Sequence, residues 1–267
     1  MRETLTRSLS GLVYIFLLIG ATLYSIESFL LLFGVFLIAC TSEFCNLVNL
    51  KKPLPIVIAI LGYVLFAFFN NFNSTNDLLL TTATLFISFK LIHLLFSEKR
   101  QHLDVQSKYV YLIGYIVLPF IIIAKLPFET KVFAPKILIG IFLIIWANDT
   151  FAYVVGKTIG KRKLFERISP KKTIEGFLGG LFFAIIFSYF IAIYLTEQPV
   201  FHWIIISLIC STFGTIGDLI ESKFKRIAGV KDSGKIMPGH GGILDRLDSI
   251  IFVSPFIFLF YQILNYA

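Results

Sequence analysis

The chain has 267 residues, a net charge of +8 and a mean hydropathy of +0.85, and only 15% of its residues are charged. Its length would suit one or two soluble domains, but 57% of the residues are hydrophobic and thirty are phenylalanine. This composition excludes an ordinary soluble protein and indicates an integral membrane protein. Nothing in the pattern of basic residues indicates a nucleic-acid partner.

Apolar runs of about twenty residues recur along the whole chain, and each is long enough to cross a hydrocarbon core of about 30 Å as a helix. We therefore predict an all-α integral membrane protein with about nine transmembrane helices; continuous apolar runs disfavour a β-barrel. We expect an N-terminal region of about five spans, residues 1–135, and a C-terminal region, residues 136–267, that carries the polar motifs. The runs cover about residues 8–26, 29–47, 53–71, 78–97, 109–128, 137–155, 177–195, 201–220 and 243–263.

The first apolar run follows Arg2 and Arg7, as in a secretory signal. Its length and the spans that follow it favour an uncleaved signal anchor. The three cysteines, Cys40, Cys45 and Cys210, all fall inside apolar spans. A thiol there usually packs as a small hydrophobe, so we predict neither a disulfide framework nor a cysteine metal site.

The orientation of the spans follows from the distribution of lysine and arginine. With nine spans, the N-terminus and the even-numbered connections share one side of the membrane and hold nineteen of the 24 basic residues. The opposite side holds only Lys125, Lys131 and Lys136, and two more, Lys90 and Arg246, lie within spans. The positive-inside rule then predicts a cytoplasmic N-terminus and a C-terminus on the other side.

Two of the basic connections contain more basic residues and glycines than the topology requires. Residues 156–176 read GKTIGKRKLFERISPKKTIEG, and residues 221–242 read ESKFKRIAGVKDSGKIMPGHGG. Glycine lets the backbone approach an anion closely, and lysine and arginine supply charge, so such loops suit phosphate groups. Contact with anionic lipid headgroups would explain the first connection equally well. The second is harder to explain in that way, because its polar elements are more specific than a solvated charge run.

Four aspartates, Asp149, Asp218, Asp245 and Asp248, lie toward the predicted cytoplasmic ends of the last spans. Asp245 and Asp248 are three positions apart and therefore share a helical face. Carboxylates in apolar spans need partners. Internal salt bridges with basic neighbours would satisfy them, and so would a divalent ion such as Mg²⁺, which favours carboxylates together with phosphate oxygens and water.

Residues 222–249, SKFKRIAGVKDSGKIMPGHGGILDRLDS, resemble the signature of the phosphatidate cytidylyltransferase (CDP-diacylglycerol synthase) family. Residues 148–164 and 168–180 are similar to the preceding conserved region of that family. Two apolar positions depart from the family pattern, Met237 and Ile174, and neither change removes a polar group. The resemblance is strong over residues 140–267 and weak before them.

The resemblance implies transfer of a cytidylyl group from CTP to phosphatidate, with Mg²⁺ as cofactor, and suggests a homodimer. The short N-terminus favours a bacterial plasma-membrane protein, and the positive-inside rule places the site on the cytoplasmic side. A monovalent cation such as K⁺ beside Mg²⁺ stays open. The implied metal ligands are Asp232, Asp245 and Asp248, with Asp218 and Asp149 as further candidates. The implied catalytic contacts are Ser222, Lys225, Arg226, Lys231, His240 and Arg246. The implied substrate contacts are Lys171, Lys172, Lys223, Gly241 and Gly242.

Several alternatives remain at this point. His240 lies among glycines, so it could be structural instead of catalytic. Glu43, Lys90 and His93 are polar residues in apolar spans that could line a cavity, bond another helix or snorkel. A related CTP-dependent enzyme acting on another lipid phosphate or on a polyprenol is the nearest functional alternative. A cation-coupled transporter is less favoured, because its buried charges would lie near the bilayer midplane in repeated halves.

Overall fold

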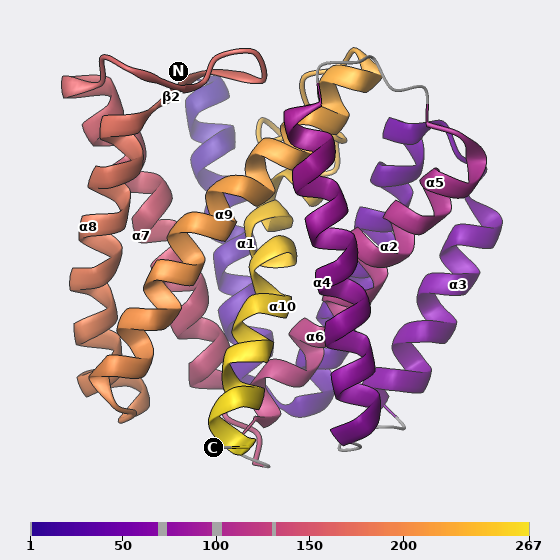
Figure 1. Cartoon of the computed structure of the whole chain (residues 1–267), viewed down its shortest axis with the longest axis horizontal. Helices are drawn as coiled ribbons and strands as arrows, with labels where there is room; N and C mark the ends of the chain where they lie inside the picture. Colours follow the sequence, from indigo (N-terminus) through magenta and orange to yellow (C-terminus); the bar gives the residue numbers. More distant parts are fainter. Residues whose placement is uncertain (1, 69–73, 98–102, 130–131, 267) are drawn as a thin grey trace.

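The computed structural model describes residues 2–68, 74–97, 103–129 and 132–266. Within them, seven helical segments are long and apolar enough to cross a membrane, and two shorter apolar helices bring the set to the predicted nine. The prediction of an all-α polytopic bundle is confirmed (Figure 1). The helices are α1 (Arg2–Tyr24), α2 (Ile26–Val48), α3 (Pro53–Tyr63), α4 (Ser74–Phe96), α5 (Val105–Tyr111), α6 (Leu118–Lys125), α7 (Pro135–Ile159), α8 (Ile174–Phe190), α9 (Val200–Ala228) and α10 (Leu244–Tyr266).

Three of the spans contain π-helical turns, in which the hydrogen bonds skip one residue further than in an α-helix. Residues Val64–Phe68 continue α3, Leu112–Val117 join α5 to α6 as one span, and Ile191–Thr196 continue α8. The fifth span ends in a short 3₁₀ turn, Leu126–Phe128. Within the described residues, each predicted apolar run therefore falls on one helical span, and the largest difference in an end is at α9, which extends to Ala228.

The two ends of the chain lie on opposite sides of the bundle, as an odd number of spans requires (Figure 1). The short hairpin between α7 and α8 lies at the same end of the bundle as the N-terminus. Part of the predicted charge asymmetry lies outside the described residues, namely Lys99, Arg100 and Lys131. The lysines and arginines of the hairpin and of the connection after α9 share the N-terminal side, which is the arrangement that the span count predicts.

Close packing of small residues with large ones holds the bundle together. Gly140 of α7 faces the ring of the fully buried Trp203 of α9, and a Cβ atom there would collide with that ring. Gly114 makes the same kind of room for Ile87 of α4. Small residues let helices approach closely where lipid offers no hydrophobic driving force between them. Large apolar side chains such as Phe16, Leu31 and Phe182 stay exposed, as expected of surfaces that face lipid.

The structure differs from the prediction in the polar connections. The connection expected over residues 221–242 is helical in its first third, because α9 continues to Ala228. It stops where Gly229 adopts a left-handed conformation, with φ of 70°, and the amides of Gly229 and Val230 donate to the last carbonyls of α9. The connection over residues 156–176 folds into an antiparallel hairpin of β1 (Lys163–Phe165) and β2 (Ser169–Thr173). All three cysteines are buried and free.

Candidate active site

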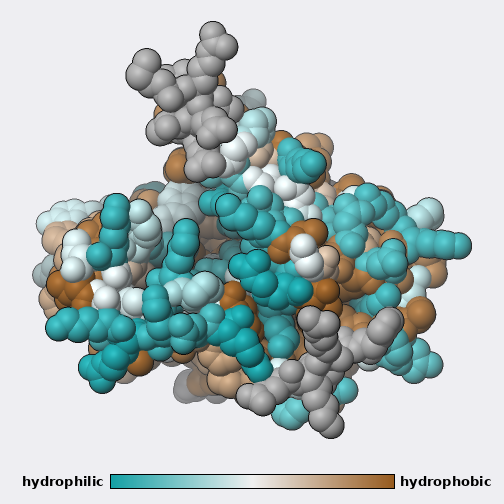
Figure 2. Space-filling view, turned by 90° about the horizontal axis from the view of Figure 1, so that it is seen from above, coloured by the Kyte–Doolittle hydropathy of each residue, from teal (hydrophilic) through white to brown (hydrophobic). Residues whose placement is uncertain are grey.

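A cavity of about 880 Å³ opens at the end of the bundle where the N-terminus lies. Its walls are the ends of α7 and α9, the starts of α8 and α10, the hairpin, and the connection between α9 and α10. Viewed onto this end of the bundle, hydrophilic side chains gather around a hollow in the surface (Figure 2). The cavity is therefore polar, wide enough for a nucleotide, and placed at the edge of the membrane-spanning bundle rather than at its centre.

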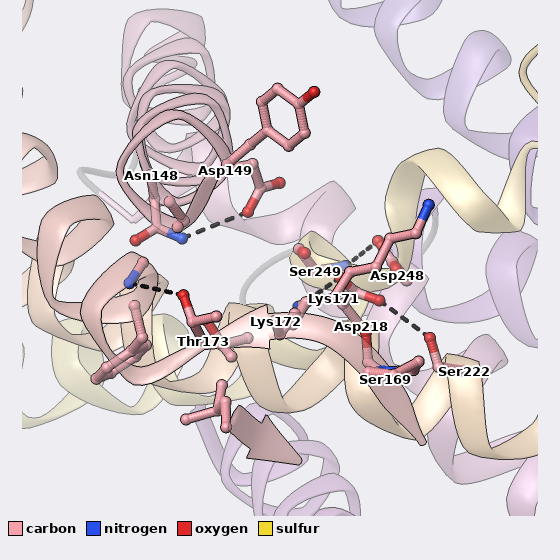
Figure 3. A pocket seen from close by; sticks show the side chains of 18 of the residues that line it. Asn148, Asp149, Ser169, Lys171, Lys172, Thr173, Asp218, Ser222, Asp248 and Ser249 are labelled. Carbon is pink, nitrogen blue, oxygen red and sulfur yellow. Dashed lines mark hydrogen bonds and ion pairs between the residues drawn. The ribbon is translucent and has the colours of Figure 1, made fainter. Parts of the chain in front are cut away.

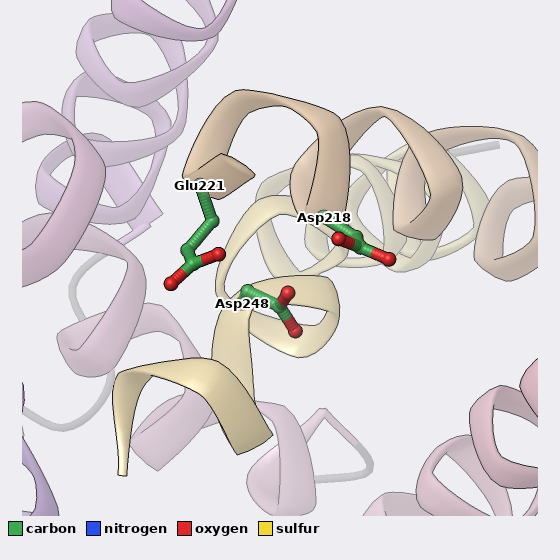
Figure 4. Close-up of side chains that lie close together, drawn as sticks. All are labelled: Asp218, Glu221 and Asp248. Atoms are coloured by element: carbon green, nitrogen blue, oxygen red, sulfur yellow. The ribbon is translucent and has the colours of Figure 1, made fainter. Parts of the chain in front are cut away.

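Three carboxylates come together at the base of this site. Asp218 and Glu221 belong to α9 and Asp248 to α10, and each offers an oxygen within 4.8 Å of the others (Figure 4). Glu221 is fully buried, and the Lys225 ammonium group contacts its Oε2 atom, whereas Oε1 accepts no hydrogen bond from the described residues. Within the described residues, no lysine or arginine forms an ion pair with Asp248. Crowded, buried carboxylates are costly unless they are paired with basic groups, protonated or bound to a cation, so this group is a candidate metal site.

Lys225 joins this cluster to the start of α10. Its ammonium group lies 2.7 Å from Oδ1 of Asp245 and also contacts the carboxylate of Glu221 one helical turn away. The other oxygen of Asp245 accepts three hydrogen bonds, from the amide and hydroxyl of Ser233 at 2.9 and 2.8 Å and from the Gly242 amide at 2.7 Å. Both oxygens of Asp245 therefore have partners within the protein, whereas Asp248 accepts one hydrogen bond from the described residues, donated by the Ser249 amide at 2.7 Å.

The hairpin supplies a second lysine from the opposite wall. Lys172 of β2 reaches α9, where its ammonium group lies 2.5 Å from Oδ2 of Asp218, and Ser222 donates a hydrogen bond of 3.2 Å to Oδ1 of the same carboxylate (Figure 3). Burial lowers the pKa of Lys172, but the charge of Asp218 and the hydrogen bond to it outweigh this effect, so its pKa is raised overall. Lys172 is thus held as a cation beside the carboxylate cluster.

The sequence around the hairpin explains how it is held in place. Thr173 caps α8 by accepting a hydrogen bond from the Gly176 amide at 3.1 Å. Glu175 in the first turn accepts hydrogen bonds from the amides of Lys161 and Arg162 at 3.0 and 3.1 Å. Gly176 packs against the backbone of α7, where a Cβ atom would lie 2.7 Å from the Ala152 carbonyl oxygen. These contacts hold the hairpin over the cavity mouth.

Most of the side chains that the sequence predicted for the site do line this cavity. They are Ser222, Lys225, Arg226, Lys231, Arg246, Lys171, Lys172 and the five aspartates Asp149, Asp218, Asp232, Asp245 and Asp248. The compact carboxylate group contains only Asp218 and Asp248 of these aspartates, together with Glu221. Asp149 enters from α7 and Asp232 from the connection, and both are exposed to the cavity.

Four predicted residues do not line the cavity. His240 lies against α1, with Nδ1 2.8 Å from the Ser10 hydroxyl oxygen, and its carbonyl accepts a 3.0 Å hydrogen bond from Arg246. Lys223 points away and donates to the Ser97 carbonyl at the end of α4 at 3.0 Å. Gly241, with φ of 88°, and Gly242 shape the loop around Asp245. These contacts explain the positions of the four residues by local structure.

The sequence prediction missed three residues near the site. Glu221 was placed at the start of a connection, although its spacing of three from Asp218 and four from Lys225 puts all three on one helical face once α9 is extended. Ser233 and Glu43 meet around Asp245 only through the tertiary fold. Lys90 and His93, by contrast, are exposed on α4 and do not line the cavity; the Lys90 ammonium lies 4.9 Å from the centre of the Phe86 ring.

Comparison with known proteins places this arrangement in a family. The sequence model of the Cytidylyltransferase family matches residues 5–264. A protein of Staphylococcus saprophyticus named phosphatidate cytidylyltransferase is 36% identical over 258 residues, which is 95% of each chain. Relatives of the same name share 52% identity over 130 residues in Staphylococcus aureus, about half of either chain at 48% and 50%, and 50% over 117 residues in Bacillus subtilis, covering 43% and 44%. The chain therefore belongs to the cytidylyltransferase family.

Proposed function

We propose that this protein is a membrane-bound nucleotidyltransferase that transfers the cytidylyl group of CTP to phosphatidate, giving CDP-diacylglycerol and pyrophosphate. The observation that carries the proposal is the cavity at the end of the bundle, where lysines from the hairpin and α9 meet carboxylates from α9 and α10. A water-soluble nucleotide has to meet a lipid headgroup at such a boundary. The name of the relative that matches nearly the whole chain supports the same substrates.

The reaction joins two polyanions. A phosphate oxygen of phosphatidate attacks the α-phosphorus of CTP, and the bond from that phosphorus to the bridging oxygen of pyrophosphate breaks. Phosphatidate is already anionic at neutral pH, since the second pKa of a phosphate monoester is about 6, so little proton removal is needed. The main obstacle is repulsion between the phosphates, which positioned positive charges can offset.

The basic side chains of the cavity suit this task. Lys171, Lys231, Arg226 and Arg246 are exposed in the cavity wall, where they can contact phosphate oxygens directly. Lys172 and Lys225 form ion pairs with carboxylates, so they would supply positive charge at a fixed position and would not bind substrate directly. In this account Ser222 donates to Asp218 and helps to orient that carboxylate.

The proposal includes Mg²⁺ as the cofactor. The donor set fits this hard cation: carboxylate oxygens of Asp218, Glu221 and Asp248 lie within 4.8 Å of one another, and Lys225 is the ion-pair partner of the buried Glu221 among the described residues. When bound, Mg²⁺ would neutralise phosphate charge and polarise a phosphoryl oxygen. Asp149 and Asp232 face the same cavity and could serve as further oxygen donors, whereas the hydrogen bonds of Asp245 favour a structural role for its carboxylate.

The proposal also covers orientation and assembly. The basic residues of the hairpin and of the connection after α9 support a cytoplasmic site in a bacterial plasma membrane, by the positive-inside rule. A homodimer belongs to the same proposal and follows from the family resemblance alone. Labelling of intact cells tests the orientation.

The decisive assay uses purified protein in detergent with phosphatidate, a divalent cation, and CTP labelled either at its α-phosphate or at its γ-phosphate. Cytidylyl transfer predicts that the α-label enters the lipid and that the γ-label leaves as pyrophosphate. Entry of the γ-label into lipid would instead indicate a CTP-dependent lipid kinase. Parallel reactions with an ether-linked phosphatidate and with a polyprenol test the other acceptors, and failure to convert phosphatidate under these conditions would contradict the proposal.

A further inference from the structure

Glu43 is a buried carboxylate near the C-terminal end of α2 that belongs to no ion pair among the described residues. It lies on α2, far from the signature segment in sequence, and is only 2% exposed. Its Oε1 atom accepts a hydrogen bond of 3.1 Å from the Ile243 amide, and its Oε2 atom accepts one of 2.8 Å from the Leu244 amide. A charged side chain in this environment needs hydrogen-bond partners, because burial of a charge without them is costly.

The two amides mark the start of α10. Leu244 is the first residue of that helix, and the first amides of a helix have no partner within it. A carboxylate at this end also interacts favourably with the helix dipole. Glu43 thus caps α10 from another helix, as a local aspartate or serine would do from the preceding residue. The residue that follows Leu244 is Asp245, and Asp248 lies one turn further on.

A second contact joins Glu43 to the site through one hydroxyl group. Ser233 lies 3.3 Å from Oε2 of Glu43 and 2.8 Å from Oδ2 of Asp245, measured from its Oγ atom. Its amide also donates to Asp245, at 2.9 Å. The connection after α9 is therefore held between the two carboxylates, and the side chain of Asp245 is in turn fixed toward Lys225.

Two glycines of the signature make room for Glu43. A Cβ atom on Gly234 would collide with Oε1 of Glu43, and one on Gly242 would collide with both carboxylate oxygens. These are the glycines of the Lys-Asp-Ser-Gly and His-Gly-Gly elements. Gly234 and Gly242 are thus explained by their close approach to a carboxylate on a distant helix.

We propose that Glu43 is a positioning residue for the reaction: it fixes the connection after α9 and the first turn of α10, and thereby holds Asp245 and Asp248 where the site requires them. Glu43 does not line the cavity, so it acts through these residues and not on substrate. The inference deepens the proposed function and rests on it for its kinetic readout. It assigns a role in the C-terminal site to the N-terminal half of the chain.

The test compares Glu43→Gln with Glu27→Gln, a matched change on an exposed residue of the same helix. The glutamine keeps the shape but presents a donor where one amide needs an acceptor. Substitution of such an outer partner typically lowers metal affinity or activity by about 10- to 100-fold. We expect kcat per folded protein to fall by that factor and the Mg²⁺ concentration for half-maximal rate to rise. Values within about twofold of those of Glu27→Gln in a folded protein would overturn the inference.

Amide hydrogen exchange gives a readout that needs no activity. In Glu43→Gln, the peptide that contains Ile243 and Leu244 should exchange faster than in Glu27→Gln, because one capping bond is lost. Equal exchange would overturn the inference even if turnover could not be measured. Failure of the wild-type protein to turn over CTP would contradict the proposed function alone, so the two failures are distinguishable.

A second variant covers the case in which Glu43→Gln does not fold. Ser233→Ala keeps every backbone bond of the loop and removes only the hydroxyl between Glu43 and Asp245. Like Glu43→Gln, it should lower kcat and raise the Mg²⁺ concentration for half-maximal rate. If both single variants fold, the double variant should be less impaired than the product of the two effects, since the groups act through one contact. Wild-type kinetics for Ser233→Ala, or full multiplicative loss in the double variant, would contradict the inference.

Discussion

Lys172 of β2 and Asp218 of α9 form an ion pair with 2.5 Å between Nζ and Oδ2, which ties the hairpin to the carboxylate cluster. Lys172→Met removes the charge and leaves Asp218 without its lysine partner. We expect the rate of CDP-diacylglycerol formation to fall by at least about tenfold, because a fixed positive charge near the reacting phosphates is lost. Steady-state kinetics at saturating CTP and phosphatidate measure the effect.

Lys161→Met is the matched control for this change, because Lys161 lies near the same hairpin, is exposed, and does not line the cavity. The control should retain nearly the wild-type rate. Equal rates for the two variants would show that the ion pair between Lys172 and Asp218 has no part in turnover.

Glu221→Gln tests the carboxylate that the sequence analysis did not include. The change preserves shape but removes a charge from the group of three carboxylates. We expect roughly a 10- to 100-fold loss of activity and a higher Mg²⁺ requirement. The measurement is a magnesium titration of the rate, with Glu166→Gln, an exposed glutamate of the hairpin, as control. An unchanged titration curve would remove Glu221 from the proposed metal site.

The sequence predicts the number of spans and most of the residues that line the cavity, for two physical reasons. Apolar runs have to match the thickness of the membrane, so they are visible in one dimension. The signature residues from Asp232 to Asp248 are close in sequence, so their convergence needs only one turn and one helix start. The extension of α9 to Ala228 was missed because its last two turns are basic, and basic residues at a membrane boundary were interpreted as a loop.

Contacts between distant segments could not be predicted from spacing. Lys172 meets Asp218 only because the hairpin folds back over α9, and Glu43 meets Leu244 only because α2 packs beside the start of α10. Conversely, His240 has the residue type and motif position of a catalytic group, yet its ring lies against Ser10 of α1. A motif places residues in a loop, and packing then decides which of them face the cavity.

The orientation predicts a pattern of chemical labelling. In a variant without the three native cysteines, single cysteines at Lys163 and Lys235, both exposed, should be shielded from an impermeant thiol reagent in intact cells. A cysteine at Gln198, in the connection between α8 and α9, should react. Lysed cells provide the control in which all three sites react. Labelling of all three in intact cells would contradict the nine-span orientation.

Glu129 predicts a pH dependence of stability at the opposite end of the bundle. Burial, together with the charge of Asp77, raises its pKa to about 8 from an ordinary value of 4.5. Between these values the folded protein holds a proton that the unfolded chain has released, so the free energy of unfolding falls as the pH rises and levels off above about 8. Glu129→Gln should remove this fall from thermal midpoints measured across that range.

The exposed Glu197→Gln provides the control for the pH experiment. It should keep the decline of the thermal midpoint that the wild-type protein shows. A wild-type midpoint that stays level between about pH 5 and 8, or an unchanged slope in Glu129→Gln, would refute the assignment to Glu129.

The central claim is that the carboxylate group of α9 and α10 is needed for the transfer because it holds the cation. Turnover of Asp248→Asn tests this claim most directly. Asp248 is buried, belongs to the carboxylate group, and has no ion pair within the part of the chain that the structure describes. The substitution keeps its shape and removes its charge. The account predicts a folded protein whose cytidylyl transfer to phosphatidate is at least about a hundredfold slower than wild type, the scale of one lost electrostatic contact. Near-normal turnover by well-folded Asp248→Asn would contradict it.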